Sequence, residues 1–158
     1  IPRAFFTSKV KVIPEMENQF TVLRKPDFNP LVTTIIEKEI GVVEYNPDSQ
    51  ANITFWSPDK IEIEASAPID QFLVLSEIYY PEGWKITSHP DWEIHPVNTI
   101  LRGIHIPAGE HHIVMEFIPD DVRYGTFLTW GSTVLLLLFI VVWINHKRKE
   151  NESLAETI

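Results

Sequence analysis

The chain has 158 residues, with 13 Lys and Arg against 22 Asp and Glu, six His and no Cys. The net charge of −9 lies entirely in residues 1–124, which contain 10 basic and 19 acidic side chains and are enough for one domain with its own core. Such an acidic surface argues against nucleic acid or an anionic lipid surface as the partner. Without cysteine, disulfides and thiolate metal sites are excluded.

The first element expected along the chain is a short helix at residues 15–23. Pro14 precedes this segment and suits the first turn of a helix. Met16, Phe20 and Leu23 recur at helical spacing, so they would share one apolar face. We therefore expect one short N-terminal helix with these three side chains on one face.

The rest of residues 1–119 has the pattern of β-strands. Polar and apolar residues alternate in several segments, as they do in half-buried strands, and a more continuously apolar run at residues 71–80 predicts a central strand. The alternating segments are residues 52–56, 60–64, 84–86, 92–94 and 112–117. Pro and Gly mark turns between them at short intervals. Short strands with frequent turns predict an antiparallel β-sandwich.

One uncharged segment follows, because residues 124–146 contain no Asp, Glu, Lys or Arg. A helix over most of this segment would be about 30 Å long, which matches the hydrocarbon core of a bilayer. Trp130 and Trp143 lie near its two ends, where indole rings favour the lipid headgroup zone. The sequence therefore predicts a single transmembrane helix at residues 125–146.

Charges on the two sides of this helix predict its orientation. Asp120 and Asp121 precede it, and a basic cluster opens the tail at residues 147–158. Because basic residues concentrate on the cytoplasmic side, the tail is expected inside and residues 1–124 outside. An extracytoplasmic domain without disulfides is usual for a bacterium, so the expected location is the bacterial cytoplasmic membrane.

Three threonines share one face of the outer half of the predicted helix. Thr126, Thr129 and Thr133 follow i, i+3, i+7 spacing. Small hydroxyl residues let another helix approach closely, so this face is expected to contact other transmembrane helices of a parent protein or a membrane complex. The alternative is that each hydroxyl bonds to its own backbone one turn back.

Four stretches of the chain together resemble a known family. They are residues 1–6, 73–85 and 101–111 and the apolar helix that follows. Their order and spacing resemble the C-terminal region of bacterial YfhO-like membrane proteins, which are grouped with the C-type glycosyltransferases that use polyprenyl-phosphate sugars. One departure is Glu82, which stands between Pro81 and Gly83 where the family usually reads Pro-Gly-Trp.

The resemblance implies that the chain belongs to a longer, multi-spanning protein. In that family the acidic catalytic residues lie in early extracytoplasmic loops, upstream of the region matched here. The chain starts mid-motif at Ile1, so we expect a fragment of such a protein that contains no catalytic residue. A polyprenyl-phosphate sugar would be a partner only through the parent, and no cofactor is predicted.

Two candidate sites remain within the domain. Tyr79, Tyr80, Trp84 and Trp92 cluster around a turn, where they could contact a carbohydrate or a protein partner, or simply cap the core.

Arg102 alternates with isoleucines on a strand face, where an unpaired guanidinium would be expensive. Glu77, on the apolar strand, is the expected partner in a structural ion pair; a site for a ligand phosphate is the alternative.

No metal site is predicted. His111 and His112 are adjacent on a strand and point to opposite faces, so they cannot bind one ion together from there. No ligand-spaced Cys or Asp completes a set. Two functions are thus open: the non-catalytic C-terminal domain and last helix of a YfhO-like protein, or a single-pass accessory subunit of a membrane complex.

Overall fold

The computed structural model describes the backbone of residues 1–41 and 44–155, and their side chains up to residue 147 except those of residues 120 and 123. The chain divides into two units, Ile1–Ile118 and Pro119–Ile158. The elements in chain order are β1 (Ala4–Phe6), β2 (Lys9–Val12), α1 (Met16–Leu23), β3 (Thr33–Ile36), β4 (Gln50–Trp56), β5 (Lys60–Ala67), β6 (Gln71–Ile78), β7 (Trp84–Ile86), β8 (Ile94–Val97), β9 (Leu101–Ile106), β10 (Gly109–Phe117) and α2 (Asp120–Ala155). The prediction of a mainly β chain with a C-terminal apolar helix is confirmed.

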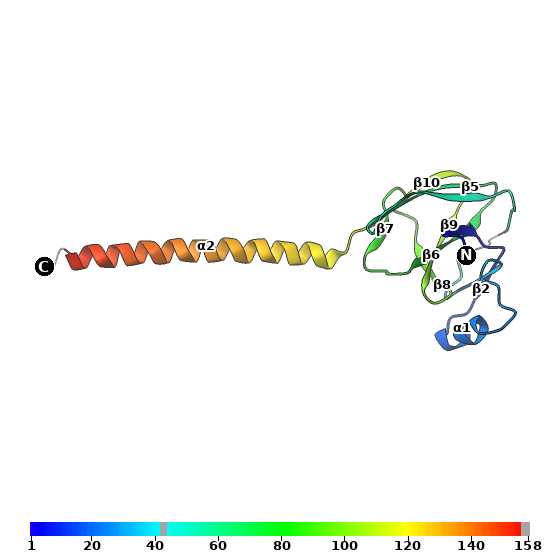
Figure 1. The fold of residues 1–158 in the computed structure, drawn as a ribbon, viewed down its shortest axis with the longest axis horizontal. Coiled ribbons are helices and arrows are strands. Elements are labelled where there is room, and N and C mark those ends of the chain that lie inside the picture. Colours follow the sequence, from blue (N-terminus) through cyan, green and yellow to red (C-terminus); the bar gives the residue numbers. More distant parts are fainter. Residues whose placement is uncertain (42–43, 156–158) are drawn as a thin grey trace. The chain divides into compact units, whose positions relative to one another are not determined.

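The first unit contains two sheets, which lie as two layers (Figure 1). One sheet has the strand order β1-β6-β9-β8-β3-β2 and the other has the order β4-β5-β10-β7. The pairings are antiparallel except for β2 with β3, which is parallel. A parallel pair needs a long crossover, and the connection from Val12 to Thr33, which includes α1, supplies it.

The main core lies between the two sheets. Alternate residues of β5 and β10 point toward alternate residues of β6 and β9, and all of them are buried. These residues are Ile61, Ile63, Ala65, Ala67, Ile113 and Met115 on one side and Leu73, Leu75, Ile104 and Ile106 on the other. Each fully buried aliphatic side chain contributes about 1.5–3 kcal/mol relative to an exposed one.

A second, smaller core covers the opposite face of β6. Phe72 and Val74 pack there with Ile36 and Val97. Strand β6 is therefore buried on both faces, which explains why its sequence is continuously apolar rather than alternating.

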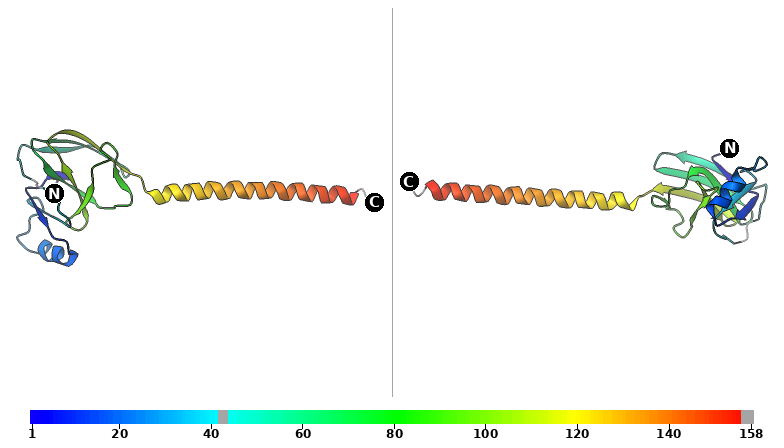
Figure 2. Two further views of the ribbon diagram at one scale, coloured as in Figure 1. Left: turned by 180° about the vertical axis from the view of Figure 1, so that it is seen from behind. Right: turned by 90° about the horizontal axis from the view of Figure 1, so that it is seen from below.

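Helix α1 lies within the predicted segment, and its buried residue is polar. Met16 and Phe20 are exposed, and Gln19 is the buried residue of the helix. The Gln19 side-chain amide donates a hydrogen bond to the backbone carbonyl of Ile13 (2.8 Å). The helix is thus attached through a buried amide, which the periodicity of its apolar residues does not reveal. Figure 2 shows that α1 lies at the outside of the first unit.

The second unit is the single helix α2. Its segment Tyr124–Lys147 is 24 residues long, with a mean hydropathy of 2.3, and is long and apolar enough to cross a membrane. Large apolar side chains such as Leu135 and Phe139 are exposed around it. A helix that is apolar on every side needs lipid or other helices around it.

Candidate binding pocket

A cavity of about 550 Å³ is lined by residues of β7 in one sheet and of β8 and β9 in the other, together with the loops that follow β6 and β7. Its lining residues are Tyr79, Tyr80, Pro81, Trp84, Lys85, Ile86, Thr87, Pro90, Trp92, Glu93, Ile94 and Arg102. The structure thus brings all four predicted aromatic residues together, and it adds Arg102 from a different strand. Small-molecule sites typically have this size and a lining of mainly apolar and aromatic residues with a few polar groups, as here.

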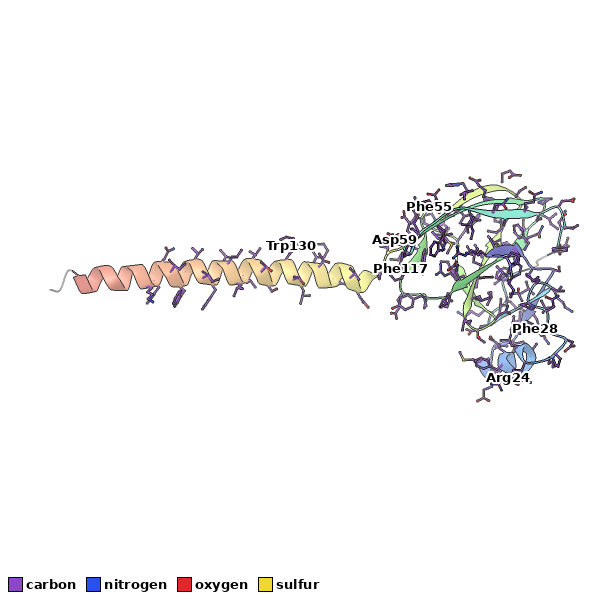
Figure 3. The ribbon with its side chains drawn as sticks, in the orientation of Figure 1. Arg24, Phe28, Phe55, Asp59, Phe117 and Trp130 are labelled. Atoms are coloured by element: carbon purple, nitrogen blue, oxygen red, sulfur yellow. The ribbon has the colours of Figure 1, made fainter. Side chains whose placement is uncertain are left out.

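The turn before β7 is shaped by a close contact between Gly83 and Phe117. A Cβ atom at Gly83 would lie 2.0 Å from the Phe117 ring, so only glycine fits here without displacing that ring. The Phe117 ring also packs against Trp84 and Tyr80, at centroid distances of 5.7 and 5.9 Å. The Phe117 N–H donates a hydrogen bond to the Asp59 carbonyl (2.8 Å), and the two residues lie side by side (Figure 3). Phe117 therefore fixes two of the predicted aromatic residues.

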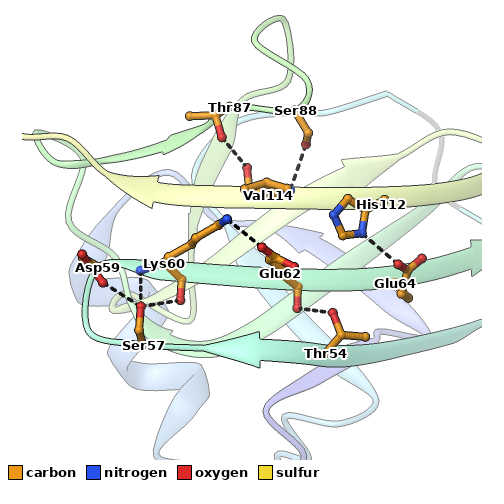
Figure 4. Close-up of polar contacts among 10 residues, drawn as sticks. All are labelled: Thr54, Ser57, Asp59, Lys60, Glu62, Glu64, Thr87, Ser88, His112 and Val114. Carbon is orange, nitrogen blue, oxygen red and sulfur yellow. Dashed lines mark hydrogen bonds and ion pairs between the residues drawn. The ribbon is translucent and has the colours of Figure 1, made fainter.

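The opposite rim is fixed by hydrogen bonds to β10. The Thr87 N–H and hydroxyl both donate to the Val114 carbonyl, at 2.8 and 3.3 Å, and the Val114 N–H donates to the Ser88 hydroxyl at 2.9 Å (Figure 4). These bonds extend the β7–β10 pairing past the end of β7. The rim of the cavity is therefore part of the sheet rather than a free loop.

Arg102 is a buried cation at the cavity. Only 4% of the residue is exposed, and its guanidinium carbon lies 4.1 Å from the centroid of the Trp84 ring. Its Nε donates to the Ile78 carbonyl (2.7 Å), while Nη1 is buried without a hydrogen-bond partner among the described residues. Burial lowers the pKa of Arg102 to about 10, against the opposing effect of Glu77. The side chain therefore remains charged at neutral pH.

The predicted ion pair between Glu77 and Arg102 takes a different form. The Glu77 carboxylate lies 3.2 Å from Nη2 of Arg3, and the Arg3 guanidinium lies over the Trp56 ring at 4.5 Å. The register of β6 against β9 shifts between Leu75 and Ile78, so strand alternation does not carry Glu77 to Arg102. Glu77 still acts electrostatically on Arg102, because its charge opposes the lowering of the Arg102 pKa.

Histidines surround Trp92, which sequence reasoning did not anticipate. The His89 ring stacks on Trp92 at 4.0 Å, and His111 meets Trp92 nearly edge-on at 5.1 Å. His111 contacts the Pro107 carbonyl and His112 pairs with Glu64, both through ring nitrogens. Among the described residues, no group of three His, Asp or Glu side chains could hold a metal ion.

The three threonines of α2 each donate a hydrogen bond to their own helix. The acceptors are the backbone carbonyls of Val122, Gly125 and Thr129, each at 2.8 Å. This is the local arrangement considered as the alternative above. Contact of Thr126, Thr129 and Thr133 with other helices stays a prediction.

The structure predicts that the domain loses stability as the pH falls from 7.5 to 5.5. Burial lowers the pKa of His95 below its ordinary 6.5, an effect that His105 and Lys38 reinforce and Glu93 opposes. The pKa of His89 is lowered too, again mainly by burial. The unfolded chain then binds protons near pH 6.5 that the folded chain does not, so stability must rise with pH in this window.

Urea unfolding at several pH values checks this expectation. The variant His95→Asn should show a shallower dependence of the unfolding free energy on pH than the unchanged chain. Adding His89→Asn should flatten it further. Equal slopes for all three proteins would contradict the assignment.

Comparisons of the chain with family models, with curated proteins and with solved structures found no match. The class of protein is therefore defined by its architecture: a mainly β unit with an aromatic, arginine-containing cavity, followed by a helix that could span a membrane.

Proposed function

We propose that this chain is a non-catalytic, extracytoplasmic binding domain, anchored by α2, of a YfhO-like integral membrane protein. The parent would transfer sugars from a polyprenyl-phosphate donor, and the two facing sheets would form a β-sandwich that presents the cavity outside the bacterial cytoplasmic membrane. The observation that carries the proposal is that two stretches behind the resemblance converge on one cavity. Tyr79, Tyr80 and Trp84 come from residues 73–85, and Arg102 comes from residues 101–111.

The walls of the cavity support binding rather than chemistry. Among the described residues, Glu93 is the one carboxylate that lines the cavity, whereas acid–base catalysis on a sugar usually uses a pair of acidic groups. Aromatic rings and a guanidinium instead provide apolar area and hydrogen-bond donors for a ligand.

The end of the apolar helix supports the orientation. The Lys147 ammonium lies 5.2 Å from the Trp143 ring centroid, which pairs a cation with an interfacial indole at one end of the span. The residues that follow Lys147 are Arg148 and Lys149. A basic, tryptophan-flanked end favours the cytoplasmic side.

Protease digestion of spheroplasts tests this topology. Protease added outside should digest residues 1–118 and spare a tag placed after Ile158, because the bilayer would protect the tail. Protection of the domain together with loss of the tag would overturn the proposal. An antibody against the domain that detects in native membranes a polypeptide of only 158 residues would favour the accessory-subunit alternative.

A further inference from the structure

Two arginines of the first unit are stacked on tryptophans, and their surroundings differ in one respect. Arg3 lies over Trp56 and has a carboxylate partner in Glu77, and its side chain is 53% exposed. Arg102 lies over Trp84, has no carboxylate partner among the described residues, and is buried. The first arginine is satisfied by its own domain and by water, whereas the second is not.

Arg102 lines the cavity, and its own domain does not satisfy all of its hydrogen-bond donors. A guanidinium has five N–H donors, and the hydrogen bond from Nε to Ile78 uses only one of them. The buried Nη1 has no partner among the described residues, a situation that is costly in a folded protein unless something else completes it. A carboxylate or phosphate matches the planar fork of a guanidinium better than a neutral acceptor does.

The remaining walls specify the rest of a ligand. Trp84 holds the guanidinium in place, and Trp92, Tyr79 and Ile94 offer apolar area next to it. Burial raises the pKa of Tyr79, as do Glu93 and Glu37, so its hydroxyl stays a neutral donor. Lys85 adds a second positive charge to the lining and Glu93 a negative one. These apolar surfaces, hydrogen-bond donors and charges together favour a ligand with one anionic group and a ring that has apolar faces and polar edges.

We propose that the cavity binds a small organic anion, with a sugar-like ring against the aromatic wall and a phosphate or carboxylate on the guanidinium of Arg102. This inference rests on the binding role proposed above and names the ligand class. The same chemistry is offered by a soluble sugar phosphate and by a lipid whose headgroup is a phosphorylated polyol.

The test measures binding to the whole chain in phosphatidylcholine nanodiscs by titration calorimetry. The probes are glucose 1-phosphate and glucuronate, which have both ring and anion, glucose, which lacks the anion, and inorganic phosphate, which lacks the ring. At least one of the first two should bind about tenfold or more tightly than glucose and than inorganic phosphate. Equal affinities, or no binding of any probe, would overturn the proposal.

Two variants form a matched pair, because each replaces an arginine that is stacked on a tryptophan. Arg102→Gln should abolish the preference for the anion, and Arg3→Gln should leave it unchanged. Equal losses in the two variants would contradict a role for Arg102. If Arg102→Gln does not fold, nuclear magnetic resonance of the unchanged protein provides the test. Glucose 1-phosphate should shift the Nε–H signal of Arg102 and not that of Arg3. The reverse result would refute the site.

Nanodiscs that contain phosphatidylinositol distinguish the two sources of the anion. Competition with glucose 1-phosphate would assign the site to a lipid headgroup, and unchanged glucose 1-phosphate binding would assign it to a soluble ligand. This test and the protease test fail independently. Correct topology without anion binding refutes only the ligand class, and anion binding with inverted topology refutes only the extracytoplasmic role.

Discussion

Replacing Gly103 by alanine is expected to destabilise the first unit by about 3 kcal/mol, near the upper end of the range for overpacked cores. A Cβ atom at this position would lie 2.4 Å from two atoms of the Phe72 ring and 2.6 Å from the Val97 side chain. Both neighbours are completely buried, so neither can move into solvent. Urea unfolding of the chain in nanodiscs, followed by tryptophan fluorescence, measures the effect.

A double-mutant cycle separates this clash from a general weakness of the strand. Phe72→Leu alone should destabilise the domain because it leaves a cavity. In the Gly103→Ala background the smaller side chain relieves the clash, so the two effects should not add. Strict additivity would show that Phe72 is not what makes glycine necessary.

Gly83→Ala provides the matched control at the other close glycine. There the added methyl group would meet the Phe117 ring, which is 37% exposed and can rotate outward. The loss of stability should therefore be smaller than for Gly103→Ala, although the aromatic wall of the cavity would change. A larger loss at Gly83 would mean that the exposed ring is held more tightly than the buried one.

The strands that could be predicted are those whose pattern is local. Alternation marks β5 and β10, which pair along their length, and the continuous apolar run marks β6 because both of its faces are buried. The pairing of β2 with β3 could not be predicted in the same way. It joins segments separated by a long connection, and neither strand is long enough to show a period.

The candidate site was predictable to a similar extent. Tyr79, Tyr80 and Trp84 are close in sequence, so their clustering follows from the turn itself. The partner of Glu77 depends on a register shift within β6 and β9 and on a contact with Arg3 near the start of the chain. Strand alternation cannot encode a bulge, which is why the pattern of β6 does not reveal that Glu77 lies beside Arg3.

The second large effect concerns α2. Replacing Leu135 and Leu137, near the middle of the segment Tyr124–Lys147, by arginine is expected to release the chain from membranes. Leucine at the centre of a membrane helix favours insertion and arginine opposes it, so each exchange costs about 3–4 kcal/mol. The two positions lie on roughly opposite sides of the helix, and one flank of the helix therefore cannot shelter both charges.

Two arginines introduced at the end of the helix, instead of its middle, should not release the chain from membranes. In the control Asn145→Arg with His146→Arg, the new side chains lie beside Lys147, where they can extend into the headgroup zone. Resistance to alkaline carbonate extraction is the measurement: the control should stay in the membrane pellet, and the central pair should appear in the supernatant. If the central pair also stays in the pellet, the apolar surface of α2 is covered by protein rather than lipid. The Thr126–Thr129–Thr133 face would then be the first place to look for the neighbouring helix, because small hydroxyl side chains allow the closest approach.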